Sequence, residues 1–165
     1  MAIPAFSLPL GVQHNCDVSK ATQVPFETTL FVRDTCLCFH LQRAARVLAR
    51  HFDDALRPLG LTSWQFSLLM ALNQPSPPSI GSVASVLGAD RTTLTAALKP
   101  VQRRGLVTVG IDANDRRSRR LKLTRAGCAL LARAVPIWRR SHAKIDRLLP
   151  RGGSDRLRDE LRALI

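Results

Sequence analysis

The residues from Asp90 to Gly127 carry side chains that suit contact with duplex DNA. Threonine, arginine and lysine open an amphipathic helix after Asp90, and a second basic segment runs from Asp115 to Lys122. Arginine can donate to guanine O6 and N7, threonine can reach a base edge or a thymine methyl group, and lysine bonds phosphate oxygens. The major groove admits a helix, and the narrow minor groove attracts arginine. This part of the sequence therefore predicts a DNA-binding surface.

The helix expected at about 89–104 should turn one face to the core and the other to DNA. Leu94, Leu98 and Val101 follow the three- and four-residue steps of a buried helical face. The side chains that we expect to face DNA are Arg91, Thr92, Thr93, Thr95 and Lys99. For the adjacent pair of threonines, capping of the helix N-terminus is the alternative.

Two short segments with strand character follow this helix, at 106–109 and 121–123. Turn-forming residues separate them at 112–115, so we expect a hairpin, called the wing below. The basic side chains that we expect to contact phosphates or to stay solvated are Arg116, Arg119 and Arg120. A basic hairpin without a DNA role is the alternative.

Helices on both sides of this surface should position it. An apolar face recurs from Leu37 to Leu59 and predicts a long helix that stops near Pro58. The residues expected to cap further helices are Thr62, Ser79, Thr124 and Ser154. A helix, a short turn and a second helix before the wing form the helix-turn-helix unit, whose second helix enters the major groove. The expected fold class is mainly α with a small β wing. Residues 1 to about 33 show no sustained period and predict an arm.

The charge of the 165-residue chain indicates a polyanionic partner. It carries 25 Lys+Arg against 12 Asp+Glu, a net charge of +13, and ten basic residues face two acids between Arg91 and Arg125. No apolar run approaches the roughly 18 residues needed to span a bilayer, and no basic leader precedes the N-terminal apolar residues. We therefore expect a cytoplasmic protein without a membrane partner. Its four cysteines match no common zinc pattern, so neither a metal nor a cofactor is expected.

Three short motifs carry a family resemblance. They are Gly60-Leu61-Thr62-x-x-Gln65-Phe66, Asp90-Arg91-Thr92-Thr93-Leu94-Thr95, and Asp115-x-Arg117 followed by Leu123-Thr124-x-x-Gly127. Together they resemble the MarR (multiple antibiotic resistance regulator) family of bacterial winged-helix transcription factors, over roughly Cys36 to Leu149. The resemblance implies an obligate homodimer that places two recognition helices on a pseudo-palindromic operator. It also implies that Asp115 holds Arg117 so that this arginine reaches into the minor groove.

The same resemblance predicts the domain organisation. Residues 1–33 are expected to form an N-terminal arm of unknown role, and residues 34–165 a MarR-like domain. Within that domain the winged helix-turn-helix is expected at about 60–125. The dimerisation helices are expected at about 34–58 and 125–165.

Residues outside the helix-turn-helix and the wing could switch DNA binding. Cys38 lies near the start of the first long helix, a register that resembles the peroxide-sensing branch of the family, in which such a cysteine is oxidised and the dimer leaves DNA. Cys36 is the second redox candidate, and a packed apolar thiol is the alternative for Cys38. The family's other switch is a small aromatic or carboxylate ligand in the cleft between the dimer helices and the winged helix. The candidate residues for that cleft are Trp64, Phe39 and Arg46.

The sequence therefore predicts a sequence-specific transcriptional regulator, a homodimeric repressor that a small aromatic or carboxylate ligand releases from DNA. A redox-sensing repressor switched by oxidation of Cys38 is the alternative, and a non-specific architectural DNA-binding protein is a more distant one. We expect no enzyme, because the chain has no recognisable nucleophile elbow, phosphate-cradling loop or metal motif.

Overall fold

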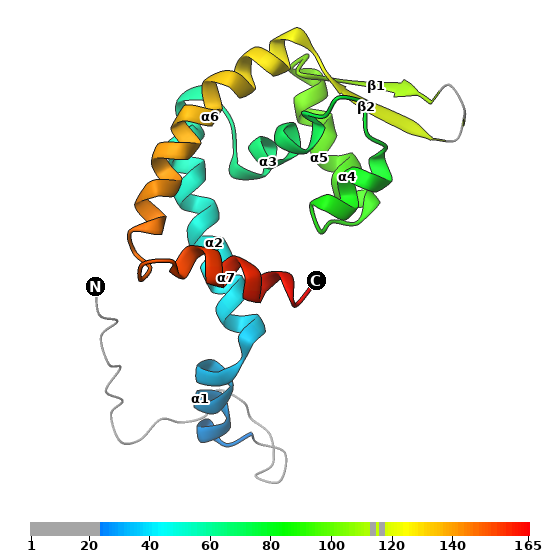
Figure 1. Ribbon diagram of the computed structural model, residues 1–165. Helices are drawn as coiled ribbons and strands as arrows, with labels where there is room; N and C mark the ends of the chain where they lie inside the picture. Colours follow the sequence, from blue (N-terminus) through cyan, green and yellow to red (C-terminus); the bar gives the residue numbers. More distant parts are fainter. Residues whose placement is uncertain (1–23, 113–114, 116–117) are drawn as a thin grey trace. The chain divides into compact units, whose positions relative to one another are not determined.

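The computed structural model describes residues 24–112, 115 and 118–165, and these are mainly helical with one two-stranded sheet (Figure 1). The elements are α1 (Phe26–Thr35), α2 (Leu37–Leu56), the 3-10 turn η2 (Arg57–Leu59), α3 (Ser63–Leu72), α4 (Ile80–Val86), α5 (Arg91–Arg103), β1 (Val107–Ile111), β2 (Arg119–Leu123), α6 (Arg125–Asp146) and α7 (Gly153–Arg162). The expected fold class is confirmed. Contacts divide the chain into two units, Met1–Arg43 and Ala44–Ile165, with the boundary inside α2.

The first unit contains a helix where the sequence pattern predicted an arm. α1 begins after Pro25 and carries Glu27 in its first turn and Arg33 in its last turn. These two charges lie at the helix ends where the macrodipole favours them. The prediction missed α1 because the helix has no buried residue and hence no apolar period. Residues 1–23 of the expected arm lie outside the described residues.

The second unit holds the hydrophobic core. α3, α4, α5, the two strands and α6 all contribute buried side chains, among them Leu69, Val83, Leu94, Leu121 and Leu131. The predicted buried face of α5 is confirmed, since Leu94, Leu98 and Val101 are at most 2% exposed. The core therefore ties the helix-turn-helix to the strands that follow it.

The apolar stripe of α2 is only partly covered within the chain. Leu56, at its C-terminal end, is fully buried. Leu37, Leu41 and Leu48, which the sequence placed on the same apolar face, remain 69%, 38% and 39% exposed. Part of the apolar stripe of α2 is therefore a solvent-exposed apolar surface among the described residues.

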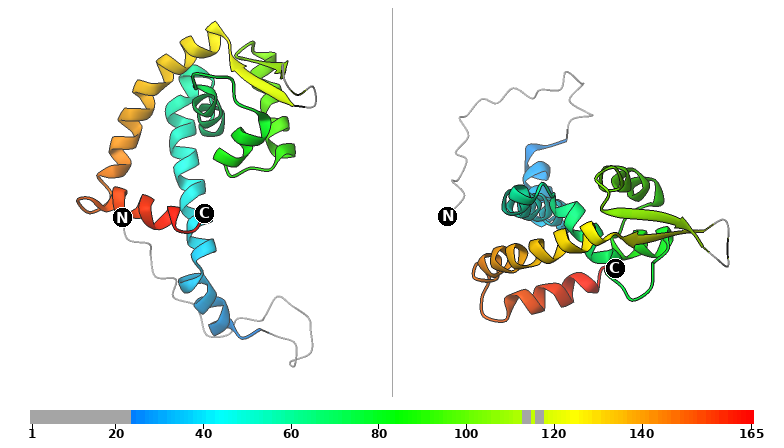
Figure 2. Two further views of the ribbon diagram at one scale, coloured as in Figure 1. Left: turned by 45° about the vertical axis from the view of Figure 1, so that its right-hand side comes forward. Right: turned by 90° about the horizontal axis from the view of Figure 1, so that it is seen from above.

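The wing is an antiparallel hairpin in which Val107 pairs with Leu123 and Ile111 with Arg119. A third segment joins it, because the Leu121 amide donates to the Pro78 carbonyl at 2.9 Å and Ser79 forms an isolated bridge with Arg120. β2 therefore lies against the residues that lead into α4. Both views of Figure 2 show the hairpin continuing directly into α6.

The start of α6 explains the motif Thr124-x-x-Gly127. The Thr124 hydroxyl accepts from the Gly127 amide at 3.0 Å and donates to the Gly105 carbonyl at 2.7 Å. A Cβ on Gly127 would lie 2.1 Å from the Leu106 carbonyl oxygen, a distance that no side chain can adopt. This position therefore requires glycine for close backbone approach.

The last helix begins one residue earlier than its expected cap. Gly152, with φ of 74°, precedes α7 as its N-cap, so the prediction that Ser154 caps this helix is wrong. The Ser154 hydroxyl instead donates to the carboxylate of Asp146 at 2.7 Å. This bond and a contact from His142 lower the pKa of the Asp146 carboxyl group.

Candidate DNA-binding surface

Asp90 is the N-cap of α5, the helix expected to contact DNA, and it uses both of its carboxylate oxygens. One carboxylate oxygen accepts from the Thr93 amide at 2.7 Å, and the other accepts from the Thr93 hydroxyl at 2.7 Å. These two bonds, with the amide bond contributing more, lower the pKa of the Asp90 carboxyl group. Of the two threonines with a possible capping role, Thr93 makes the cap contact, which orients its hydroxyl toward Asp90.

The other predicted contact residues of α5, Arg91, Thr92, Thr95 and Lys99, are all exposed. By helical spacing Thr92 and Lys99 lie opposite the core face, whereas Arg91 lies beside that face because it is three residues before Leu94. The Thr95 hydroxyl donates to the Arg91 carbonyl at 2.7 Å, a common back-bond within helices. A Cβ on Gly81 would come within 3.1 Å of the Arg91 Nη2 atom, so the Arg91 guanidinium lies over the first turn of α4.

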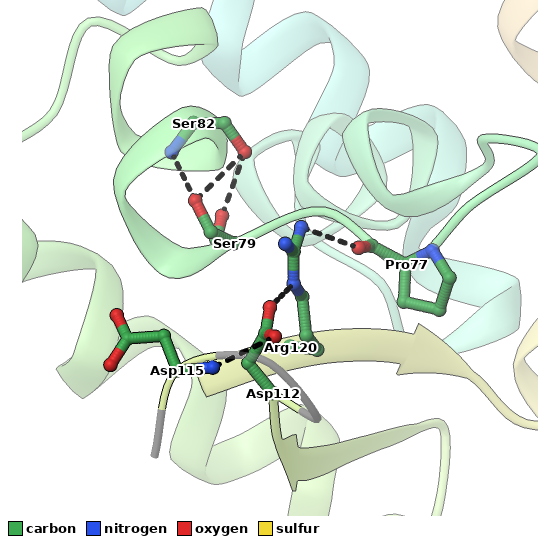
Figure 3. Close-up of polar contacts among 6 residues, drawn as sticks. All are labelled: Pro77, Ser79, Ser82, Asp112, Asp115 and Arg120. Atoms are coloured by element: carbon green, nitrogen blue, oxygen red, sulfur yellow. Dashed lines mark hydrogen bonds and ion pairs between the residues drawn. The ribbon is translucent and has the colours of Figure 1, made fainter. Parts of the chain in front are cut away.

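Arg120 of the wing makes specific contacts within the protein (Figure 3). Its Nε atom donates to Asp112 Oδ2, and its Nη1 atom donates to the Pro77 carbonyl at 3.2 Å. The Asp112 side chain is only 7% exposed, whereas that of Arg120 is 48% exposed. The guanidinium therefore joins the two strands of the wing to the segment before α4. Its predicted phosphate contact stays a prediction.

The remaining wing residues can be placed only in part. Arg116 and Arg117 lie outside the described residues, so the expected pair of Asp115 and Arg117 stays a prediction. Asp115 itself is exposed, and its amide donates to Asp112 Oδ1 at 3.3 Å. Arg119 is exposed at the start of β2.

The fold brings the recognition helix and the wing onto one structural unit. α5 contacts both α4 and β1, and β2 contacts α3, α4 and α6. Both segments singled out in the sequence are therefore held by the same core. Such an arrangement can present a helix and a basic hairpin to adjacent grooves of one duplex.

Two positioning residues escaped the sequence analysis. Arg104, the C-cap of α5, donates through Nη1 to the Gly60 carbonyl at 2.6 Å and through Nη2 to the Leu59 carbonyl at 3.3 Å. Asp53 of α2 accepts from the Ser63 amide at 2.6 Å, in the first turn of α3. The first contact joins the C-cap of α5 to η2, and the second joins α2 to the start of α3. The sequence offered no signal for them, because the partner atoms are backbone groups 10 to 45 residues away.

The two redox candidates lie at the junction of α1 and α2. Cys38 is exposed, and the Gln42 Nε2 atom lies 3.1 Å from its Sγ atom. Cys36 is half-buried and forms the C-cap of α1. Among the described residues, no group of three or more histidine, cysteine or carboxylate side chains could hold a metal ion.

The three residues predicted for a ligand cleft are divided between the two units. Phe39 belongs to Met1–Arg43 and is 44% exposed, whereas Arg46 and Trp64 belong to Ala44–Ile165. The second unit contains another aromatic cluster, which the sequence did not reveal. Trp138 stacks against Phe52 and Phe66, with ring centroids 6.5 and 6.0 Å apart, and it also contacts His142. This cluster joins α2 and α3 to α6.

Comparison with known proteins identifies the family. The model of the MarR family matches residues 61–118. The transcriptional activatory protein BadR of Rhodopseudomonas palustris is 35% identical over 94 residues, which make up 55% of this chain and 54% of BadR. The organic hydroperoxide resistance transcriptional regulator of Bacillus subtilis is 31% identical over 101 residues, 61% of this chain and 69% of that regulator. The chain thus spans about half the length of BadR.

Solved structures agree over more of the chain. The transcriptional regulator MosR of M. tuberculosis in complex with DNA is 40% identical, with a TM-score of 0.71 over 78% of this chain and 92% of MosR. The repressor CouR bound to a 23-mer DNA duplex is 31% identical, with a TM-score of 0.72 over 81% of this chain and 94% of CouR. CouR bound to p-coumaroyl-CoA is also similar, at 28% identity and a TM-score of 0.72 over 81% and 94% of the two chains.

The chain therefore belongs to the MarR family of DNA-binding transcriptional regulators, which are not enzymes. The family resemblance in the sequence is confirmed, and so is the expectation of a regulator rather than an enzyme. Among the helices of the described residues, none combines the length and the apolar composition that crossing a bilayer requires.

Proposed function

We propose that this regulator is a repressor that binds a pseudo-palindromic operator as a homodimer and is released by a small aromatic or carboxylate ligand. The observation that carries the proposal is the exposure of Arg91, Thr92 and Lys99 on α5, a helix whose apolar face packs fully into the core. Arg91 and Thr92 are assigned to base edges and Lys99 to a phosphate. Because the partner is chromosomal DNA, we place the protein in the bacterial cytoplasm.

The homodimer is supported by the apolar surface that the chain leaves exposed. Leu41 and Leu48 on α2, Leu157 on α7, and Leu164, which follows α7, are each between 38% and 61% exposed. Covering such side chains with a second copy removes apolar area from water and stabilises the pair. A two-fold dimer would place two α5 helices about one DNA turn apart, which matches a palindrome.

The ligand is proposed by analogy with CouR, a similar repressor that has been solved with p-coumaroyl-CoA. Arg46 and Trp64, which both belong to the second unit, are the residues that we assign to such a ligand. Aromatic rings can stack on an aromatic ligand, and an arginine can bind its carboxylate.

Genome-wide selection of bound DNA tests the proposal most directly. Purified protein is incubated with fragmented genomic DNA, and the bound fragments are sequenced with and without aromatic acids such as p-coumarate or benzoate. A shared inverted repeat that is lost in the presence of an aromatic acid supports the proposal. Binding without any sequence preference would instead indicate an architectural DNA-binding protein. Reporter expression from the selected operator then decides between repression and activation, since the similar BadR is named as an activator.

A redox switch at Cys38 is the second candidate, because this thiol is exposed with a side-chain amide donor 3.1 Å away. An organic hydroperoxide would transfer one oxygen atom to the thiol, so that an S–O bond forms as the O–O bond breaks. The cysteine becomes a sulfenic acid, and the hydroperoxide becomes an alcohol. The similar regulator from Bacillus subtilis is named for organic hydroperoxide resistance. Cumene hydroperoxide should then release wild-type protein from DNA but not the Cys38→Ser variant, and release of both would exclude Cys38 as the sensor.

A further inference from the structure

We infer that Arg120 is a positioning residue, which holds the wing against the segment leading into α4, and is not one of the phosphate contacts. The inference rests on the proposed DNA-binding function and specifies how its surface is held in place. Three contacts carry it: the ion pair with Asp112, the bond to the Pro77 carbonyl, and the backbone bridge between Arg120 and Ser79.

The first contact closes the wing at the base of its turn. Asp112 follows β1 and is buried, and its Oδ2 atom accepts from Arg120 Nε on the opposite strand. Its Oδ1 atom accepts from the Asp115 amide at 3.3 Å, and its own amide donates to the Ser118 carbonyl at 3.2 Å. Asp112 thus bonds to residues on both sides of the turn. Figure 3 shows its bonds with Arg120 and Asp115. The Arg120 guanidinium supplies positive charge to a carboxylate that has little access to water.

The second and third contacts join the wing to the helix-turn-helix. Arg120 Nη1 donates to the Pro77 carbonyl, and the next residue, Leu121, donates its amide to Pro78 at 2.9 Å. Ser79, the bridge partner of Arg120, is also the N-cap of α4, where its hydroxyl accepts from the Ser82 amide at 3.1 Å. The chain of contacts therefore runs from Asp112 through Arg120 to the first turn of α4 (Figure 3).

The Arg120 guanidinium is oriented toward acceptors within the protein. Two nitrogens of this planar group, Nε and Nη1, donate to acceptors on two different segments. A phosphate contact needs mainly the positive charge, which lysine can also supply, whereas the two fixed bonds need the geometry of arginine. The wing and α4 contact the same core, so a change at Arg120 should alter the angle at which the wing meets DNA.

Four variants separate positioning from phosphate contact in operator titrations at several salt concentrations. Arg120→Gln should weaken binding on the order of tenfold, with an unchanged salt slope. Arg120→Lys should not restore affinity. Asp112→Asn should also weaken binding, and the double variant should be no weaker than Arg120→Gln alone. Lys122→Gln is the matched control, because it removes the same charge from the same face of β2, and it should bind more tightly than Arg120→Gln.

A phosphate contact predicts the opposite pattern. Arg120→Lys would then bind nearly as well as wild type, and Asp112→Asn, which removes a negative charge near DNA, would bind equally or more tightly. The salt slope of Arg120→Gln would fall by about 0.9 for each lost contact, or nearly two for a dimer. Either near-wild-type operator affinity of Arg120→Lys or this fall in the salt slope of Arg120→Gln would overturn the inference.

Amide hydrogen exchange of the free protein tests the positioning role without DNA. Loss of the ion pair between Asp112 and Arg120 should speed exchange of the Leu121 and Ser118 amides in Asp112→Asn and Arg120→Gln. The same amides should exchange at the wild-type rate in Lys122→Gln. If wild-type protein binds no operator but these amides exchange faster in the two variants than in wild type, the proposed function fails and the positioning role stands. If the amides exchange at wild-type rates in both variants, the positioning role fails, whatever the DNA titrations show.

Discussion

The Arg104 Nη1 atom donates to the Gly60 carbonyl oxygen at 2.6 Å, which joins the C-terminal cap of the recognition helix to the turn that ends α2. Gly60 adopts a left-handed conformation, with φ of 62°, so its carbonyl direction depends on that turn. The Leu59 carbonyl accepts a second bond from the same guanidinium. Arg104 therefore fixes the C-terminal end of α5 to the segment that follows α2.

The Arg104→Gln variant should lower the free energy of unfolding by about 1 kcal/mol, because two carbonyl contacts lose a charged donor on a partly solvated surface. Urea unfolding monitored by circular dichroism measures the change. Arg103→Gln is the control, since it removes the same charge one residue earlier on the same helix. Equal stabilities for the two variants would show that the Gly60 contact contributes nothing.

The Gly127→Ala variant should be strongly destabilised. The added Cβ would lie 2.1 Å from the Leu106 carbonyl oxygen, so the start of α6 must move away from the strand. The expected loss is about 2 kcal/mol or more, read from the thermal midpoint and from urea unfolding. Gly110→Ala is the matched control, because a Cβ there meets no atom within 4 Å. A wild-type melting temperature for Gly127→Ala would contradict the close approach.

The Lys99→Gln variant should weaken DNA binding about equally for all sequences. A phosphate contact carries no base information, and its loss should reduce the salt slope by about 0.9 for each protomer. Fluorescence anisotropy with operator and with unrelated duplexes, at 50 to 200 mM salt, measures both effects. Lys144→Gln, at the far end of α6, is the control for lost charge. A selective loss of operator binding would instead place Lys99 at a base edge.

The Leu48→Glu variant should dissociate the proposed dimer. A charge at this exposed apolar position would be buried without a partner in the dimer interface, so the dimer dissociation constant should rise at least about tenfold. Sedimentation equilibrium across a concentration series detects the change. Arg50→Glu, on the opposite face of α2, introduces the same side chain and should remain dimeric. If both variants keep the wild-type mass, the apolar stripe is not the interface.

Acid should weaken the cap of the recognition helix. Folding lowers the pKa of Asp90, chiefly through the Thr93 amide bond. Its ionised form therefore contributes stability that is present above the unfolded pKa of about 4 and is lost as the pH falls through the lower folded value. Asp90→Asn keeps an acceptor for the amide but cannot ionise. Urea unfolding between pH 6 and pH 3 should show wild type more stable at pH 6, with the difference shrinking below about pH 4. Parallel curves would exclude Asp90 as a contributor.

Much of the fold follows from local sequence patterns. The caps Thr62, Ser79, Asp90 and Thr124 begin helices within a residue or two of their expected starts, and the hairpin forms where turn residues separate two apolar segments. These elements could be predicted because caps, periodicity and turn chemistry act over three or four residues. α1 could not, since it lacks a buried face.

The helix α5, the wing, the concentration of positive charge and the family could all be predicted from the sequence, because each depends on residue types at short and regular spacing. The partners of Arg104 and Arg120 became known only from the folded structure. The sequence led us to expect Arg120 at a phosphate or in solvent and offered no expectation for Arg104, yet each donates to a backbone carbonyl more than 40 positions away. Which acceptor a long, flexible side chain reaches depends on how the core packs distant segments together, and no local pattern records that distance.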